Sequence, residues 1–193
     1  MNVSTYLQAG YPGLAIVSSE EARVEAEIAA VCTSLERRLH AWSSSEGLVD
    51  PTEGRVTPCP DPLDAIQLLE GLFATDNPRH VVLLRDLQLH LDQSDPLLIR
   101  RLKDTLRVAK ANGHALILLG CRLKLPAELE HEITHVDFSL PDASQLGTVL
   151  DGIVKSAKLK NVHEVIIRAT EKMKKNMDVK MSMPTRPRTG SRL

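Results

Sequence analysis

Aromatic residues are scarce in this chain: they make up 3% of its 193 residues, whereas hydrophobic residues as a whole make up 42%. A sizeable core is still possible, but it has to be built from aliphatic side chains. The length suits one α/β domain with an appendage. We therefore expect buried strands and helices that are rich in Leu, Val, Ile and Ala.

Cysteine is too sparse and too scattered to support a disulfide framework or a zinc site. The three cysteines, Cys32, Cys59 and Cys121, are odd in number, and no Cys-x-x-Cys pair occurs. We expect them to be reduced thiols in a cytosolic protein.

Histidine and acidic residues do not indicate a metal site either. His131 and His135 have the i,i+4 spacing of two ligands on a helix, but they span a predicted turn into a strand. Asp86, Asp92 and Asp95 are better explained as solvated loop acids than as a cation site. The other histidines considered are interpreted as ordinary surface residues: His80, His90 and His114.

Long apolar runs are absent. No stretch approaches the roughly 20 residues that cross a bilayer, and no basic segment followed by an apolar run opens the sequence. We expect no membrane contact and no signal peptide, and we place the protein in the cytoplasm.

Charge is balanced overall, at −1, but unevenly distributed. From Lys155 to the end there are eleven Lys and Arg against three Asp and Glu, whereas the preceding residues hold thirteen against twenty-two. An acidic body with a basic tail is not typical of a nucleic-acid-binding domain, although the tail suits an acidic partner. Nucleic acid is therefore not the expected ligand.

The fold is indicated by residues 80–86, in which four consecutive apolar residues are followed by Arg85 and Asp86. Such a run is typical of a strand buried on both faces. Helical patterns flank it at 63–74 and 97–111, and strands alternating with helices predict a mainly parallel sheet. Ligands of such sheets bind beyond the carboxyl ends of the strands, where Asp86 stands. Five strands are predicted, at residues 13–17, 39–42, 80–86, 115–119 and 134–138.

Helices are predicted on both faces of this sheet, which gives a three-layer α/β fold. The first helix should cover residues 19–38, with Ser18 and Glu21 at the spacing of a capping box. Two more should begin at Asp61-Pro62 and Asp95-Pro96, because proline is tolerated in a first helical turn. Asn112-Gly113 should close the last of these as a left-handed cap.

The connections and the C-terminal part complete the predicted organisation. Residues 43–62 are predicted to be a loop, and residues 126–131 a single helical turn. The α/β domain is predicted to extend over residues 1–157. A basic amphipathic helix should follow at 158–177 and a disordered tail at 178–193.

The order of these elements resembles the core of AAA-type ATPases. Residues 115–121 are similar to the strand that leads to the family's sensor-1 position, residues 125–129 to its Pro-Glu-x-Leu segment, and residues 136–142 to the strand before its last core helix. Residues 81–86 then correspond to the Walker B strand. In more detail, the chain resembles the degenerate N-terminal half of AAA proteins encoded in chloroplast and cyanobacterial genomes, whose intact ATPase domain lies downstream. The resemblance covers roughly residues 11–155 and implies a P-loop-type sheet, and a stromal location if the gene is plastid-encoded.

The phosphate-binding loop of that family has no counterpart in the sequence. The signature Gly-x-x-x-x-Gly-Lys-[Ser/Thr] uses glycines so that backbone N–H groups can surround phosphate, and a lysine to neutralise its charge. At the corresponding position stand Ser18, Ser19, Glu20 and Glu21. Two carboxylates at a helix N-terminus are favoured by the helix dipole but would repel a triphosphate.

The other catalytic positions of the family also depart from its pattern. Arg85-Asp86 matches the end of the Walker B strand, but Leu87 replaces the glutamate that would activate water. Cys121-Arg122 stands at the sensor-1 position, where a polar pair ending in Asn is usual. Residues 130–132, Glu-His-Glu, occupy the expected place of an arginine finger. Phosphate binding, water activation and charge neutralisation are thus all unsupported.

These departures favour a non-catalytic AAA ATPase-like module that binds a protein partner, such as an AAA ATPase domain or subunit. No cofactor and no metal are expected under this hypothesis. A second hypothesis is a fragment or variant of an AAA ATPase that binds ATP and Mg²⁺ through a rearranged site. A third is a small regulatory module whose basic tail binds nucleic acid.

Overall fold

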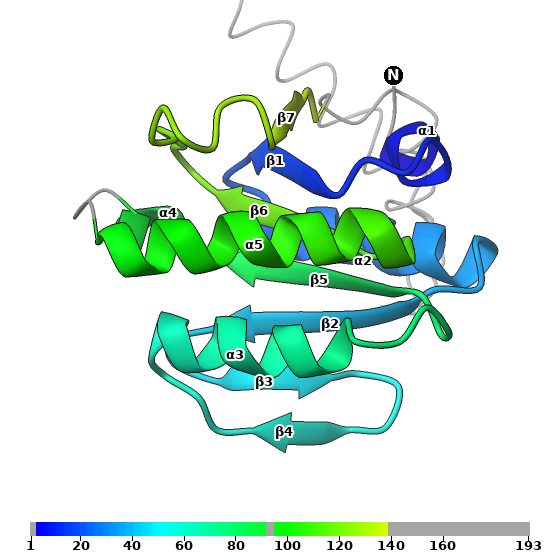
Figure 1. Cartoon of the computed structure of the whole chain (residues 1–193). Coiled ribbons are helices and arrows are strands. Elements are labelled where there is room, and N and C mark those ends of the chain that lie inside the picture. Colours follow the sequence, from blue (N-terminus) through cyan, green and yellow to red (C-terminus); the bar gives the residue numbers. More distant parts are fainter. Residues whose placement is uncertain (1–2, 92–94, 139–193) are drawn as a thin grey trace, which may run out of the picture. The chain divides into compact units, whose positions relative to one another are not determined.

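The described part of the chain, residues 3–91 and 95–138 of a computed structural model, contains a seven-stranded sheet with helices on both faces. The strand order is β4-β3-β2-β5-β6-β1-β7 (Figure 1). The strands are β1 (Gly13–Val17), β2 (Arg38–Ser43), β3 (Gly47–Asp50), β4 (Arg55–Thr57), β5 (His80–Arg85), β6 (Ala115–Gly120) and β7 (Thr134–Val136).

The five strands predicted from sequence are all present and pair in parallel. β6 lies between β5 and β1, and β2 and β7 flank these three. The apolar runs account for the central position of β5 and β6: every residue of β6 is buried, as are all residues of β5 except Arg85. Val82 and Leu118, which lie on these two strands, are completely buried. The prediction that 80–86 forms a central strand is confirmed.

The sheet is nevertheless mixed rather than mainly parallel with five strands. The predicted loop at 43–62 is wrong, because it contains β3 and β4, which extend the sheet from β2 as an antiparallel meander. Gly47 makes the turn into β3 with φ +81°, a conformation that glycine adopts at little cost. Trp42 is fully buried, and its indole N–H donates to the carbonyl of Cys59 at 2.8 Å. The indole therefore ties the chain beyond the meander back to β2.

Different helices cover the two faces of the sheet. α3 (Pro62–Leu72) and α5 (Pro96–Asn112) lie side by side on one face (Figure 1). The other face packs against α1 (Val3–Gln8) and α2 (Glu21–Ser34), whose buried residues share a cluster with Leu14 and Ile16 of β1. A short helix, α4 (Gln88–Leu91), follows β5. α1 was not predicted from the sequence.

The predicted helix ends were partly right. Asp61 and Asp95 cap α3 and α5 by accepting from backbone N–H groups, and Gly113 ends α5 with φ +74°. The proposed capping box is wrong: the hydroxyl of Ser18 accepts from the N–H of Glu20, and α2 begins only at Glu21. α2 also ends at Ser34 instead of residue 38, because β2 begins at Arg38. Residues 126–131 form turns, not a helical turn, and the elements predicted beyond 138, with the 157 boundary, lie outside the described residues.

The histidines divide into buried and exposed groups. His80 and His114 are 4% and 2% exposed, so their interpretation as surface residues is wrong, whereas His131 and His135 are exposed.

Cys32 and Cys59 are buried free thiols and Cys121 is exposed. Within the described residues, no three histidine, cysteine or acidic side chains are arranged to hold a metal ion. Over the same residues, no helix has the length and apolar character needed to span a bilayer.

Candidate functional site

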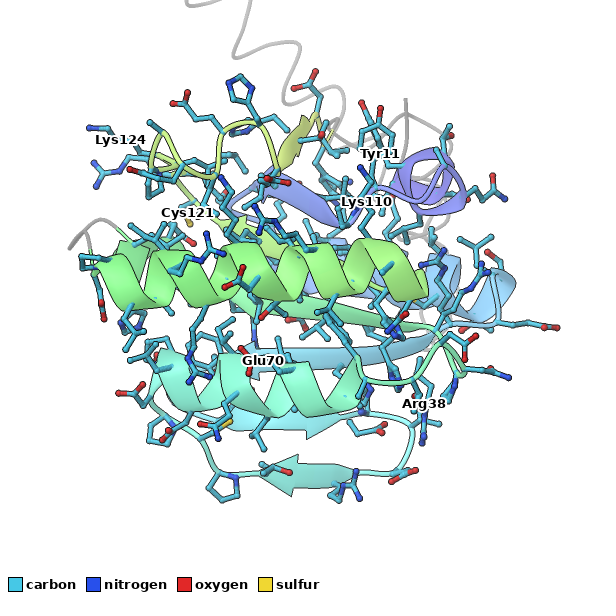
Figure 2. The ribbon with its side chains drawn as sticks, viewed as in Figure 1. Tyr11, Arg38, Glu70, Lys110, Cys121 and Lys124 are labelled. Atoms are coloured by element: carbon cyan, nitrogen blue, oxygen red, sulfur yellow. The ribbon has the colours of Figure 1, made fainter. Side chains whose placement is uncertain are left out.

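The carboxyl ends of β1, β5 and β6 meet at one edge of the sheet and bring the sequence-predicted positions together. The N–H of Ser18, just after β1, donates to the carbonyl of Gly120 at 3.1 Å. The N–H of Asp86, just after β5, donates to the carbonyl of Leu119 at 2.9 Å. Cys121 lies at this edge and Arg38 at the opposite one (Figure 2). Ligands of parallel sheets bind at such an edge.

Arg85 is the centre of an ion-pair cluster on the side of the sheet that α2 covers. Its guanidinium lies 3.7 Å from the carboxylate of Glu21 and 3.4 Å from that of Glu25, both on the first two turns of α2. It also pairs with Glu46, from the turn between β2 and β3. The Arg85 side chain is only 17% exposed. The cation at the end of β5 is therefore held by three carboxylates of this chain.

Glu25 is the most constrained of these carboxylates. Burial raises its pKa above the usual range, attraction by Arg85 lowers it, and repulsion by Glu21 and Glu46 raises it. One of its oxygens is shielded from water without a hydrogen-bond partner. The cluster thus keeps carboxylates close together that would repel one another without the guanidinium.

Replacing Arg85 by Met should therefore destabilise the fold by roughly 1–2 kcal/mol, which is less than for a fully buried pair because Glu21 and Glu46 are half exposed. Urea unfolding at low ionic strength is the measurement. Arg100→Met is the matched control, since its pair with Asp104 is exposed and should be worth under about 0.5 kcal/mol. Equal losses in the two variants would show that the Arg85 cluster contributes no more than a surface pair.

The connection from β1 to α2 uses its own polar groups internally. It consists of Ser18, Ser19 and Glu20. The N–H of Ser18 is bonded to Gly120 and that of Glu20 to the Ser18 hydroxyl, at 3.0 Å. The Glu20 carboxylate accepts two hydrogen bonds from Arg23, at 2.7 and 2.9 Å. Each of the two carboxylates at the start of α2 thus has an arginine partner: Glu20 pairs with Arg23 and Glu21 with Arg85.

The end of β5 is closed by α4. Asp86 has φ +55° and is exposed, and one of its carboxylate oxygens accepts from the side-chain amide of Gln88 at 3.0 Å. Leu87 is completely buried in the core beneath this turn. Gln88 is 3% exposed and lies so close over Gly120 that a side chain at that position would overlap its amide. The glycine that ends β6 therefore makes room for Gln88.

The remaining predicted positions are less integrated. Cys121 and Arg122 directly follow β6 and are exposed. Residues 130–132 lie in turns before β7, where Glu132 approaches Lys103 of α5 at 3.8 Å. The structure thus joins Arg85 with Glu21 and Ser18 with the end of β6.

Sequence reasoning missed four polar residues of this edge: Arg23, Glu25, Glu46 and Gln88. The i,i+4 spacing of Glu21 and Glu25 on one helix face was a usable signal for two of the three Arg85 partners. Glu46 had no such signal, because the meander that carries it was assigned to a loop. Nothing in the sequence distinguishes Gln88 from other polar residues that follow a strand.

Comparison with known proteins agrees with this architecture. The family model described as "SpoVK-like AAA ATPase, N-terminal domain" matches residues 1–138. The chain is similar to the uncharacterized AAA domain-containing protein ycf46 of Trieres chinensis, with 30% identity over 79% of this chain and 30% of that protein. Proteins of the same name from Pyropia yezoensis and Guillardia theta are 24% and 28% identical, over 86% and 72% of this chain. The chain spans about a third or less of these relatives, from 27% to 33% of their length.

Two solved structures share the fold. One is a DNA replication initiation factor, with a TM-score of 0.53 and 15% identity over 92% of this chain and 59% of that one. The other is the replication initiator DnaA bound to AMPPCP and single-stranded DNA, with a TM-score of 0.52 and 16% identity over 86% and 53%. The family model matches residues 1–138, which is most of the chain, so the chain belongs to the family of SpoVK-like AAA ATPase N-terminal domains.

Proposed function

We propose that this chain is a non-catalytic AAA ATPase-like module that binds protein and packs against an ATPase domain or subunit. The observation that carries the proposal is the Arg85 cluster: the polar groups where a phosphate would be expected already engage one another. A module of this kind keeps the fold of an ATPase domain while its role is assembly. It needs no cofactor or metal of its own.

The backbone around the β1–α2 connection supports this reading. A phosphate cradle depends on N–H groups that point into free space at a helix N-terminus. Here the N–H groups of Ser18 and Glu20 are already used within the chain. The adjacent carboxylates, Glu20, Glu21, Glu25 and Glu46, outnumber the arginines Arg23 and Arg85 that pair with them. The excess negative charge adds repulsion, because like charges about 4 Å apart repel by about 1 kcal/mol even in bulk water. We attribute both the internally bonded N–H groups and the adjacent carboxylates to degenerate Walker motifs.

The end of β5 supports it as well. Catalysis of hydrolysis needs a group that orients or activates water. Leu87 takes that place and is buried, so neither its chemistry nor its orientation suits the task. Asp86 is left with an amide partner, and one carboxylate is a poor Mg²⁺ site without further oxygen ligands.

One observation keeps the enzyme hypothesis as the second candidate. The relatives are about three times as long as the match, and they are named as AAA domain-containing proteins. If this chain is joined to, or assembles with, an intact ATPase domain, ATP hydrolysis belongs to that domain. The third hypothesis concerns the basic residues after Lys155, which lie outside the described residues. Cytoplasm or chloroplast stroma remains the expected location.

Calorimetric titration of the full chain with Mg-ATP is the test. We expect no saturable binding, with any dissociation constant weaker than about 1 mM. Low-micromolar binding that is lost in Asp86→Ala would overturn the proposal and promote the enzyme hypothesis. Binding that survives Asp86→Ala but is lost on removal of the residues after Lys155 would indicate capture by the basic tail instead.

The interaction half of the proposal has its own test. The chain is mixed with the part of the Trieres chinensis relative that it does not match, and complex formation is followed by sedimentation velocity. We expect a complex to form. Because this chain is not expected to bind ATP, added ATP should not change the stability of the complex through this chain. Absence of a complex at concentrations of about 100 µM, well above a typical micromolar affinity, would contradict the proposed partner class.

A further inference from the structure

Three buried histidines line the edge of the sheet opposite to the Arg85 cluster. His40 of β2, His80 of β5 and His114, just before β6, are 3%, 4% and 2% exposed. The ring centroid of His80 lies 5.1 Å from that of His40 and 5.4 Å from that of His114. Phe73, at the end of α3, stacks on His114 at 4.6 Å. This set of rings is independent of the proposed function and is used by no part of it.

Hydrogen-bond direction assigns a protonation state to His114. Its Nδ1 lies 2.9 Å from the backbone N–H of His80, which is a donor, so Nδ1 must accept. Its Nε2 lies 2.6 Å from the carbonyl oxygen of Thr75, which is an acceptor, so Nε2 must donate. His114 is therefore neutral and carries its proton on Nε2. Any further proton would go to Nδ1 and place two donors face to face.

The same reasoning orders the His40–His80 pair. Nε2 of His40 and Nδ1 of His80 are 3.0 Å apart, so one of them donates and the other accepts. Nδ1 of His40 faces the carboxylate of Asp50 at 3.8 Å, and the facing oxygen of Asp50 is buried without a hydrogen-bond partner. A proton on Nδ1 of His40 suits this carboxylate, which makes His40 Nε2 the acceptor and His80 Nδ1 the donor. The pair can take up one proton without losing its bond, and a second breaks it.

The three histidines connect neighbouring segments of the chain. Asp50 is the last residue of β3, so His40 connects β2 to the β3–β4 meander. His114 holds Thr75, and Asn112 holds the carbonyl of Phe73 at 2.8 Å, so both secure the connection from α3 to β5. We propose that His40, His80 and His114 form an acid-sensitive latch, and that its protonation releases the β3–β4 meander and residues 74–79 from the sheet.

Charged groups that face the latch modify how readily it takes up protons. Cations predominate on the α2–β2, β2, β4 and α3–β5 segments, and they oppose protonation. Carboxylates come from β3, from the β3–β4 turn and from the α3–β5 connection, and they favour it. The groups concerned are Arg37, Arg38, Arg55 and Arg79 on one side and Asp50, Glu53 and Asp76 on the other.

Burial is the main cause that lowers the pKa of each of the three histidines, and for His80 the pKa falls to about 4. An unfolded histidine titrates near 6.5. Because the folded pKa lies below the unfolded one, the stabilisation is complete above pH 6.5 and is lost as the pH falls towards 4. The release is therefore expected in mildly acidic solution.

Two measurements on the unmodified full chain test the latch. Nitrogen-15 NMR of the histidine side chains at pH 7.5 should show the Nε2–H tautomer for His114 and the Nδ1–H tautomer for His40. Hydrogen exchange at pH 5, corrected for the intrinsic pH effect, should speed up in residues 47–57 and 74–80 and not in β1 or β6. Titration of all three rings near pH 6.5, or uniform exchange along the chain, would overturn the proposal.

A variant pair separates the latch from general acid sensitivity. In His80→Asn the amide can still donate to His40 but cannot take up a proton. His131→Gln removes an exposed histidine and is the control. Lowering the pH from 7.5 to 5 reduces the folding constant of the unmodified chain by some factor, and for His80→Asn this factor should be at least about ten times smaller. His131→Gln should follow the unmodified chain. Identical pH dependence in all three proteins would contradict the latch.

Discussion

Leu118→Ala is expected to destabilise the domain by about 2–5 kcal/mol. Leu118 is completely buried on β6, where it is paired in register with Leu84 of β5 and Ala15 of β1. Removing its side chain loses transfer free energy and leaves a cavity that rigid neighbouring strands cannot collapse around. Against a typical domain stability of about 5–15 kcal/mol this is a large fraction. Chemical denaturation, read from the urea midpoint at unchanged slope, is the measurement.

Leu97→Ala supplies the matched control for this loss. Leu97 lies in the first turn of α5 and is 54% exposed, so the same chemical change removes little buried surface. Its effect should stay within about 0.5 kcal/mol. If Leu118→Ala cost under about 1 kcal/mol, or no more than Leu97→Ala, the centre of the sheet would have to lie elsewhere.

The parallel part of the fold could be predicted because its strands are buried on both faces. Val82 and Leu118 belong to continuous apolar runs, and such a run has few other places in a folded chain. Asp61-Pro62 and Asp95-Pro96 marked helix starts correctly because a capping carboxylate followed by proline suits a first helical turn, and a helical apolar pattern follows each pair. In these elements local preference and tertiary packing favour the same structure.

The meander at 43–62 could not be predicted because its strands are short and half exposed. Val49 and Val56 face each other across β3 and β4, but the segment that contains them is rich in polar residues, glycine and proline. Composition of that kind indicates a loop, and only pairing with the already formed β2 makes it a sheet edge. The candidate site was incomplete for the same reason, since Glu46 reaches Arg85 only because β2 and β3 are joined there.

The capping box at Ser18 and Glu21 was wrong because tertiary contacts used both residues differently. The Ser18 hydroxyl accepts from Glu20, one residue earlier than a capping box requires, and Glu21 faces Arg85 from β5. A spacing rule sees only the local chain, whereas a guanidinium 64 positions away in sequence decides where the carboxylate lies. The i,i+4 spacing places Glu21 and Glu25 on one helix face, but nothing in the local sequence identifies Arg85 as the partner of that face.

Gly47→Ala should be the most damaging of three glycine substitutions, with a loss of about 2–4 kcal/mol. Gly47 has φ +81°, which an L side chain adopts at a cost of about 1–2 kcal/mol. A Cβ there would also overlap the backbone at the end of β4 and just after it: it would touch the carbonyl of Thr57, lie 2.9 Å from the nitrogen of Cys59 and 3.0 Å from Cα of Pro58. Backbone atoms cannot move aside without breaking the β3–β4 pairing, so strain and overlap add.

Two other glycines separate these causes. Gly54 has φ +64° but open space around it, so Gly54→Ala should show the conformational cost alone, about 1 kcal/mol. Gly71 lies inside α3 with open space, so Gly71→Ala should stabilise by up to about 1 kcal/mol through better helix propensity. Thermal and urea unfolding of the three variants should rank Gly47 well below Gly54 and Gly71 above the unmodified chain. If Gly47→Ala lost no more stability than Gly54→Ala, the turn would not be packed against residues 57–59, and the antiparallel extension of the sheet would be the part of the fold in error.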